Sequence, residues 1–147
     1  MHKYLGILYL GLLLFISACS TSPAPPTDQA RIQGIWLAQT ESQNGRKRKV
    51  AYQYVFRGDK FTFKDESGKE MKYSFKLDTA SNLKLLVIQP AESRTNSTPV
   101  GVVYPVGVAY ELAGDSLTIV VAAPGSRPTE ISDKNNQELI VCKRKGR

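Results

Sequence analysis

The sequence predicts an all-β domain, built as an eight-stranded antiparallel up-and-down barrel of the lipocalin-like kind. Turn signals recur about every ten residues from Gly34 onward, and no helix-length 3.6-residue periodicity interrupts them. Residues 70–77 alternate apolar and polar side chains, which is typical of a strand with one buried face. Closing eight strands into a barrel removes the exposed edges of an open meander. A two-sheet sandwich remains the alternative, because periodicity alone does not separate the two.

Eight segments carry the strand pattern, and we expect them to pair in chain order. Asn44-Gly45 is the strongest hairpin signal, since both residues accept positive φ, and Gly58-Asp59 and Gly114-Asp115 mark two further turns. The predicted strands are residues 34–43, 52–57, 60–64, 70–77, 83–89, 106–113, 116–123 and 138–143.

The predicted inward face is rich in large side chains. An eight-stranded barrel is just wide enough to be filled by side chains or to hold one small ligand. So many aromatic rings favour a filled interior, and a ligand pocket stays open as the alternative. The inward set is Tyr52, Tyr54, Phe56, Phe61, Phe63, Met71, Tyr73 and Phe75.

Successive loops of an up-and-down barrel alternate between its two ends. The expected loops 44–49, 66–69, 90–105 and 124–137 therefore share one end, together with the basic run Arg46-Lys47-Arg48-Lys49. Long loops in compact domains are often functional. We predict a positively charged ligand mouth at this end, and its candidate residues are Tyr54, Phe63, Tyr73 and Arg127.

The first residues have the layout of an export signal. A basic start is followed by an uncharged apolar run over residues 4–16 and then by small residues. The run is too short to span a bilayer, which needs about 20 apolar residues. Ile16-Ser17-Ala18-Cys19 resembles the bacterial lipobox, which implies that Cys19 carries diacylglycerol and becomes the first residue after cleavage.

This layout predicts three parts: a signal peptide over residues 1–18, a tether over residues 19–31 and the barrel over residues 32–147. The tether is rich in Pro, Ser and Thr, with weak helical signals near its end at residues 28–32. Ser20 stands where an aspartate would mark inner-membrane retention, so we expect anchoring to the periplasmic face of the outer membrane. The predicted mature chain keeps 19 of 20 Lys and Arg against 13 Asp and Glu, a net charge of +6.

The residue inventory narrows the chemistry. The single histidine, His2, leaves with the signal, which removes His-based triads and His-ligated metal sites. Cys142 has no intramolecular partner if lipid occupies Cys19, and its apolar strand neighbours predict a buried, inert thiol. We expect no enzymatic activity, no metal or cofactor and no nucleic-acid partner.

Two motifs resemble a known family. Gly34-Ile35-Trp36 matches the Gly-x-Trp signature of lipocalins. The run over residues 110–119, its continuation through residues 122–130, and residues 58–63 are similar to an uncharacterised lipocalin-like domain family best populated in planctomycete bacteria. The similarity covers about residues 32–145, with Ala123 in place of the first of two prolines.

The resemblance implies a calycin-type barrel and brings no known activity. It also implies that Trp36 closes one end of the barrel beneath a basic residue of the last strand. Arg144 is the first candidate and Lys143 the second. Two functions remain open: a binding module for a small apolar or anionic ligand, or a structural module with a filled barrel that contacts cell-wall polymer or a protein.

Overall fold

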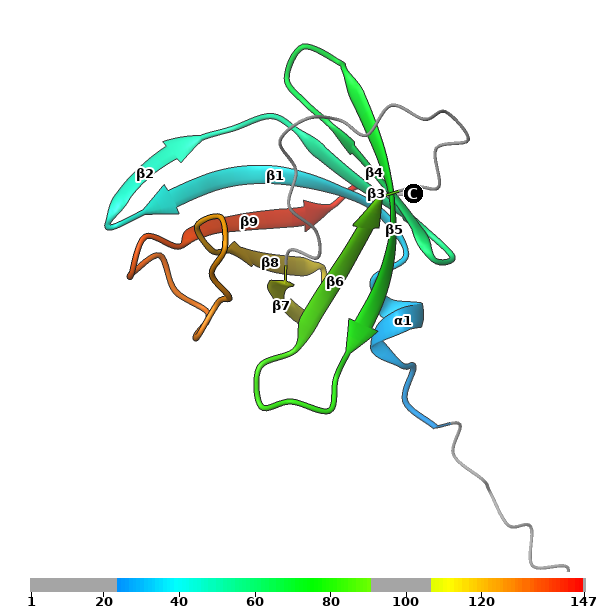
Figure 1. Cartoon of the computed structure of the whole chain (residues 1–147). Helices are drawn as coiled ribbons and strands as arrows, with labels where there is room; N and C mark the ends of the chain where they lie inside the picture. Colours follow the sequence, from blue (N-terminus) through cyan, green and yellow to red (C-terminus); the bar gives the residue numbers. More distant parts are fainter. Residues whose placement is uncertain (1–23, 91–106, 147) are drawn as a thin grey trace, which may run out of the picture.

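The computed structural model of the chain describes residues 24–90 and 107–146. The predicted signal peptide, the lipidation site Cys19 and nearly all of the expected loop 90–105 lie outside these residues. The described residues form one short helix and one sheet, whose curvature Figure 1 shows. The elements are α1 (Asp28–Arg31), β1 (Gly34–Gln43), β2 (Arg46–Lys49), β3 (Gln53–Arg57), β4 (Lys60–Lys64), β5 (Glu70–Asp78), β6 (Leu85–Pro90), β7 (Gly107–Ala113), β8 (Ser116–Val121) and β9 (Glu138–Arg144).

The sheet closes on itself, so the predicted barrel is confirmed and the sandwich is not formed. All strands pair antiparallel in chain order, and β1 pairs with β9 from Trp36↔Arg144 to Gln43↔Glu138. The barrel has eight strand positions because β2 and β3 share one. The first part of β1 pairs with β3, and its outer part pairs with β2.

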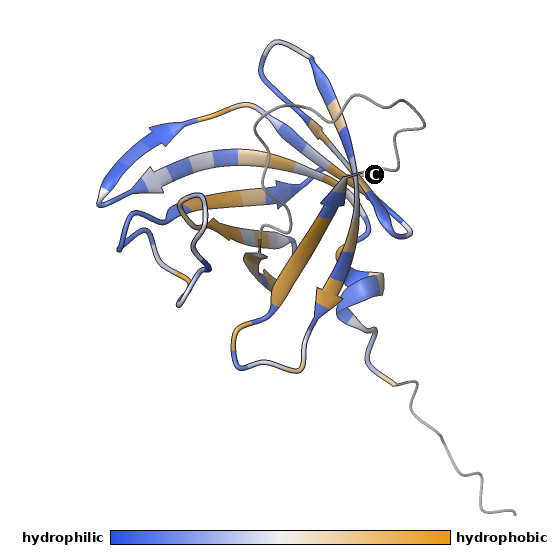
Figure 2. Ribbon diagram, in the orientation of Figure 1, coloured by the Kyte–Doolittle hydropathy of each residue, from blue (hydrophilic) through white to orange (hydrophobic). Residues whose placement is uncertain are grey.

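Strand β2 corrects the prediction that residues 44–49 form a loop. Asn44 and Gly45 do turn with positive φ values of 50° and 79°, as the hairpin signal predicted. The basic run then returns along β1, from Gln43↔Arg46 to Thr40↔Lys49. All four basic side chains of β2 are exposed, so the backbone gains its ladder hydrogen bonds without burying charge. Figure 2 shows β2 and the outer part of β1 as a hydrophilic extension, whereas β6 to β9 are mostly hydrophobic.

A β-bulge in β1 decides which of its side chains face the interior. The register with β9 shifts between Ala38 and Thr40, which leaves Gln39 as the extra residue. Trp36 and Ala38 face inward before the bulge. After the bulge Glu41 lies opposite the buried Ile140, so its side chain also faces inward.

The barrel has a closed end and an open end. The closed end carries α1 and the turns at residues 58–59 and 114–115, whereas the open end carries the turn at residues 44–45 and the loops 65–69 and 122–137. The inward side chains toward the closed end are buried, and stacked or edge-on rings join Phe56 to Phe61 and Phe75 at 5.6 and 5.2 Å.

Toward the open end, several inward side chains keep accessible surface. These partly exposed residues are Tyr54, Phe63, Tyr73, Ile88 and Val121. Leu77 and Leu112 are also partly exposed, at the rim of the closed end. The prediction of a tightly filled interior therefore describes one half of the barrel better than the other. Within residues 24–90 and 107–146, no helix is long and apolar enough to cross a membrane.

Candidate functional site

The closed end brings together the two residues that the resemblance to lipocalins paired. The guanidinium carbon of Arg144 lies 4.1 Å from the centre of the fully buried Trp36 ring, a cation–π distance. Trp36 Nε1 donates to the carbonyl of Ile32 at 2.7 Å. Gly34, with φ +115°, leaves room for this arrangement, because a Cβ there would lie 3.0 Å from Arg144 Nη1. Lys143, the second candidate, pairs with Leu37 in the β1–β9 ladder and has an exposed side chain.

Arg144 also fastens the chain that enters the barrel. Its guanidinium donates to the carbonyls of Gln33, at 2.6 Å, and Arg31, and its Nε lies 3.2 Å from the Asp115 carboxylate. One arginine thus links the start of β1, the end of α1 and the turn before β8. These contacts make the closed end a plug in which each nitrogen of the Arg144 guanidinium has an oxygen partner.

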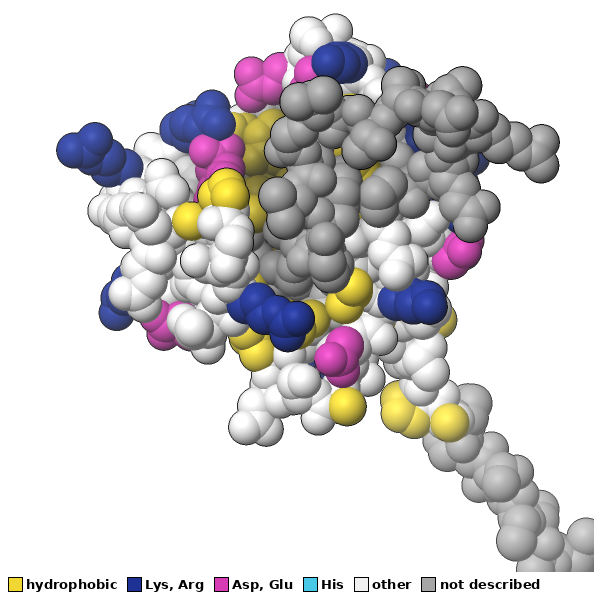
Figure 3. Space-filling model, in the orientation of Figure 1, with side chains coloured by type: hydrophobic (Ala, Val, Ile, Leu, Met, Phe, Trp, Pro, Cys, Tyr) yellow, Lys and Arg dark blue, Asp and Glu magenta, His cyan; other side chains and the backbone are white. Residues whose placement is uncertain are grey.

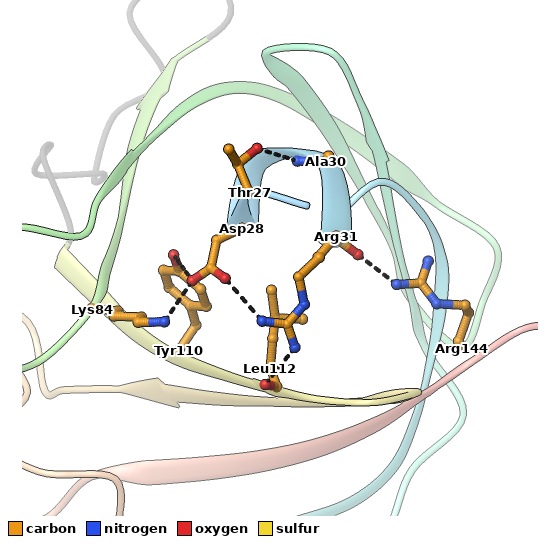
Figure 4. A network of polar contacts seen from close by, with 8 residues as sticks. All are labelled: Thr27, Asp28, Ala30, Arg31, Lys84, Tyr110, Leu112 and Arg144. Carbon is orange, nitrogen blue, oxygen red and sulfur yellow. Dashed lines mark hydrogen bonds and ion pairs between the residues drawn. The ribbon is translucent and has the colours of Figure 1, made fainter. Parts of the chain in front are cut away.

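Helix α1 is docked onto the barrel by a second polar network, drawn in Figure 4. The Asp28 carboxylate accepts from Lys84 Nζ at 2.8 Å, from Arg31 at 3.1 Å and from the hydroxyl of Tyr110 at 3.1 Å. The hydrogen bond from Lys84 is the main reason that the pKa of Asp28 is lowered. Arg31 Nη2 donates in turn to the carbonyl of Leu112 at 2.9 Å.

These contacts shift the predicted domain boundary. Residues 28–31, placed at the end of the tether, form the helix that closes the barrel. The weak helical signal of this stretch was real, because Thr27 caps the helix and accepts from the amide of Ala30. Residues 28–31 therefore pack as part of the barrel domain.

At the open end, three of the four predicted mouth residues share the inward face. Tyr54 and Phe63 are cross-strand partners with ring centres 5.4 Å apart, and Tyr52 packs 5.9 and 5.4 Å from them. The ring centres of Tyr73 and Phe61 lie 5.0 Å apart in a stacked arrangement, and Phe61 lies nearer the closed end than Phe63 does. These rings line one side of the open half.

The sequence interpretation missed an acidic pair on the same inward face. Glu41 accepts two hydrogen bonds from Arg48, at 2.7 and 2.8 Å, and one from the hydroxyl of Tyr52 at 2.8 Å. The other carboxyl group of the pair belongs to Glu138, at the start of β9, and it is hydrogen-bonded to the carboxyl group of Glu41. Two carboxyl groups hydrogen-bond to each other only when one of them holds a proton.

The environment decides which carboxyl group is protonated. Burial raises the pKa of Glu138 to about 7, and the hydrogen bond to Glu41 and its negative charge add to the rise. Burial also opposes the charge of Glu41, but hydrogen bonds from Arg48, Glu138 and Tyr52 outweigh it, so the pKa of Glu41 is lowered. Near neutral pH, Glu41 is ionised, whereas the protonated and the ionised forms of Glu138 are both present.

The hydroxyl of Tyr54 is a further polar group on this inward face. Tyr54 is partly buried, and burial raises the pKa of its hydroxyl well above the usual value. The hydroxyl makes no hydrogen bond to any described residue. Every buried side-chain nitrogen and oxygen of the described part has a partner, so this hydroxyl is accessible to a water-sized probe. The Tyr54 hydroxyl is therefore a polar group of the inward face that can still take part in a hydrogen bond.

Arg127, the fourth predicted mouth residue, is not brought to this face. It lies in the loop between β8 and β9 with an exposed side chain. The buried Gln137 orders this loop: its side chain accepts from the amide of Thr129 at 2.9 Å and donates to the carbonyl of Ser132 at 3.4 Å.

The described residues hold no cluster of His, Cys, Asp and Glu suited to a metal ion. Cys142 is fully buried with a free thiol, and burial raises its pKa to about 12, which matches the expected inert thiol.

Strand alternation in the sequence predicts an inward side chain for only one member of the acidic pair. Glu138 is two residues before Ile140 and four before Cys142, so strand alternation places it inward. The same alternation places Glu41 outward, and only the bulge at Gln39 turns it in.

The function of this chain has to be inferred from its sequence and its fold. No family model, no curated protein and no solved structure matches this chain.

Proposed function

We propose that this chain is a non-enzymatic, lipocalin-like lipoprotein of the bacterial cell envelope, whose barrel takes a small, largely apolar ligand through its open end. The observation that carries the proposal is the contrast within one continuous inward face. Side chains toward the closed end are buried, whereas Tyr54, Phe63, Tyr73, Ile88 and Val121 keep accessible surface toward the open end.

This contrast has a simple energetic meaning. Accessible apolar surface inside a barrel gains about 25 cal/mol for each Å² that a ligand covers. The plug at Trp36 and Arg144 blocks passage through the closed end, so entry and exit use the open end. An eight-stranded barrel that is closed at one end is wide enough for one small molecule at most.

The anchor rests on the sequence alone, on Ile16 to Cys19 after a signal-like apolar run. Metabolic labelling with a tagged fatty acid tests it directly. Wild type should be labelled and fractionate with the outer membrane, whereas Cys19→Ala should remain unlabelled as an uncleaved precursor. Equal labelling of both chains would refute the anchor.

Native mass spectrometry of the full chain extracted from its own membranes tests the ligand. We expect a non-covalent adduct on wild type that Phe63→Trp removes, because the larger ring fills the open half. Thr62→Trp is the matched control, since Thr62 is the neighbouring residue on the outer face of β4 and should leave the adduct in place. Well-folded wild type without adduct, and without saturable binding of an apolar fluorescent probe, would refute the ligand.

The second candidate is an interaction module, favoured by the four exposed basic side chains of β2. On the face shown in Figure 3, however, Lys and Arg side chains are dispersed among acidic and uncharged ones. The acidic pair inside the mouth also repels anions, so we leave an anionic ligand out of the proposal. Pull-down by cell-wall polymer that depends on Arg46 to Lys49, combined with no ligand adduct, would favour this second function.

A further inference from the structure

When both carboxyl groups inside the open half are ionised, one of their negative charges has no positive charge to compensate it. Glu41 and Glu138 supply two negative charges, and Arg48 supplies one positive charge through its two hydrogen bonds to Glu41. The Arg48 side chain is 65 % exposed, so it approaches Glu41 from the rim, and among the described residues no ion pair joins it to Glu138.

We propose that the ligand of the open half is an apolar amine, whose protonated nitrogen binds between the carboxyl groups of Glu41 and Glu138 while its apolar body lies against the rings of Tyr54 and Phe63. This inference rests on the proposed function and adds the chemical class of the head group. The ammonium supplies the missing positive charge, and its N–H groups are donors for carboxylate oxygens.

The unpartnered hydroxyl of Tyr54 is independent support for a polar head group at this depth. Tyr54 lies on β3 and Tyr52 precedes it on the same inward face. Tyr52 already donates to Glu41, whereas the Tyr54 oxygen has no described partner and is free to accept an N–H. A purely apolar ligand would cover this hydroxyl and leave it without a hydrogen bond, which is unfavourable.

Amine binding should depend on pH through Glu138. Ionisable groups lie around this carboxyl group on four strands: Glu41 on β1, Arg48 on β2, Tyr54 on β3 with Tyr52 directly before it, and Cys142 farther along β9. Of these, Glu138 alone changes charge between pH 6 and 8, because its pKa is about 7. An amine that requires the ionised pair should therefore bind roughly tenfold more tightly at pH 8 than at pH 6.

Three probes with one apolar body separate the head-group inference from the proposed function. Octylamine, octanol and octanoate are titrated calorimetrically into the full chain in detergent, with titrations into detergent alone subtracted. We expect octylamine to bind about 10- to 100-fold more tightly than octanol at pH 8, and octanoate to bind most weakly. The octanol affinity should not change between pH 6 and 8.

Two variants locate the preference. Glu138→Gln should reduce the octylamine affinity to that of octanol, whereas Glu111→Gln, the same change on the outer face of β7, should keep the preference. If Glu138→Gln does not fold, the pH dependence of wild type still decides. Equal binding of octylamine and octanol, or tighter binding of octanoate, would overturn the amine inference and leave the ligand function standing. No binding of either octanol or octylamine would overturn the proposed function itself.

Discussion

Strand β9 carries an inward-facing charged residue at each end, Glu138 at the open end and Arg144 at the closed end. The guanidinium of Arg144 is surrounded by carbonyls of Arg31 and Gln33, the Asp115 carboxylate and the Trp36 ring. Each of its three nitrogens contacts an oxygen atom of the chain, so the charge stabilises the fold. The carboxyl group of Glu138 instead faces the like-charged carboxyl group of Glu41.

This difference shows how one barrel separates stability from binding. A buried charge with all of its partners adds rigidity, whereas a partly partnered charge raises the folded-state free energy until something supplies the missing partner. We therefore expect changes at the closed end to alter the free energy of unfolding strongly. Changes at the open end should alter it weakly and act on ligand binding.

The largest effect should come from Trp36→Ala. The change removes a fully buried ring, the hydrogen bond from Nε1 to Ile32 and the surface over which Arg144 lies. Large-to-small changes of this kind cost about 3–5 kcal/mol, a large share of the stability of a small domain. Urea denaturation of the full chain measures it. A loss below about 1 kcal/mol would mean that Trp36 does not close the barrel.

A matched pair of phenylalanines on neighbouring strands sharpens the comparison. Phe56 is 1 % exposed toward the closed end, and Phe63 is partly exposed toward the open end. We expect Phe56→Ala to cost about 3–5 kcal/mol and Phe63→Ala about half as much, because water already reaches the second ring. Equal losses would show that the open half is packed as tightly as the closed half.

The contact between Trp36 and Arg144 at the closed end was predicted from the resemblance of Gly34-Ile35-Trp36 to the lipocalin signature. Regular alternation agrees with it, because Trp36 and Arg144 keep the parity of their strands. The hairpin at Asn44-Gly45 was also predictable, since two successive positive φ values require such residues. Predicted and observed strands consequently agree to within one or two residues at most ends, apart from β2.

The open end could not be predicted, because it depends on an irregularity. The bulge at Gln39 reverses the alternation of β1, and no residue type there announces it. Without the bulge, Glu41 would face the solvent and Glu138 would have no carboxyl partner. The basic run of β2 misled for a related reason: four charged residues indicate a solvated surface, and strand or loop is equally compatible with that exposure.

The smallest effect, and the one specific to the acidic pair, is the pH dependence of stability. The pKa of Glu138 is raised from 4.5 to about 7 in the folded chain, so the folded state holds this proton more tightly than the unfolded state does. The free energy of unfolding should therefore fall as the pH rises from about 4.5 to about 7, and level off above that range. Because Glu138 lies near the solvent, we expect a loss of only about 1 kcal/mol.

The Glu138→Gln amide keeps a donor for Glu41 without a proton to lose, so this variant should match wild type at pH 5 and exceed it by that amount at pH 8. The raised or lowered pKa values of Asp28, Glu41, Asp65 and Cys142 lie outside this window. Urea denaturation of wild type, Glu138→Gln and the outer-face control Glu111→Gln at pH 5, 6, 7 and 8 measures the difference. Parallel stability curves for wild type and Glu138→Gln would mean that the two carboxyl groups do not share a proton in the folded chain.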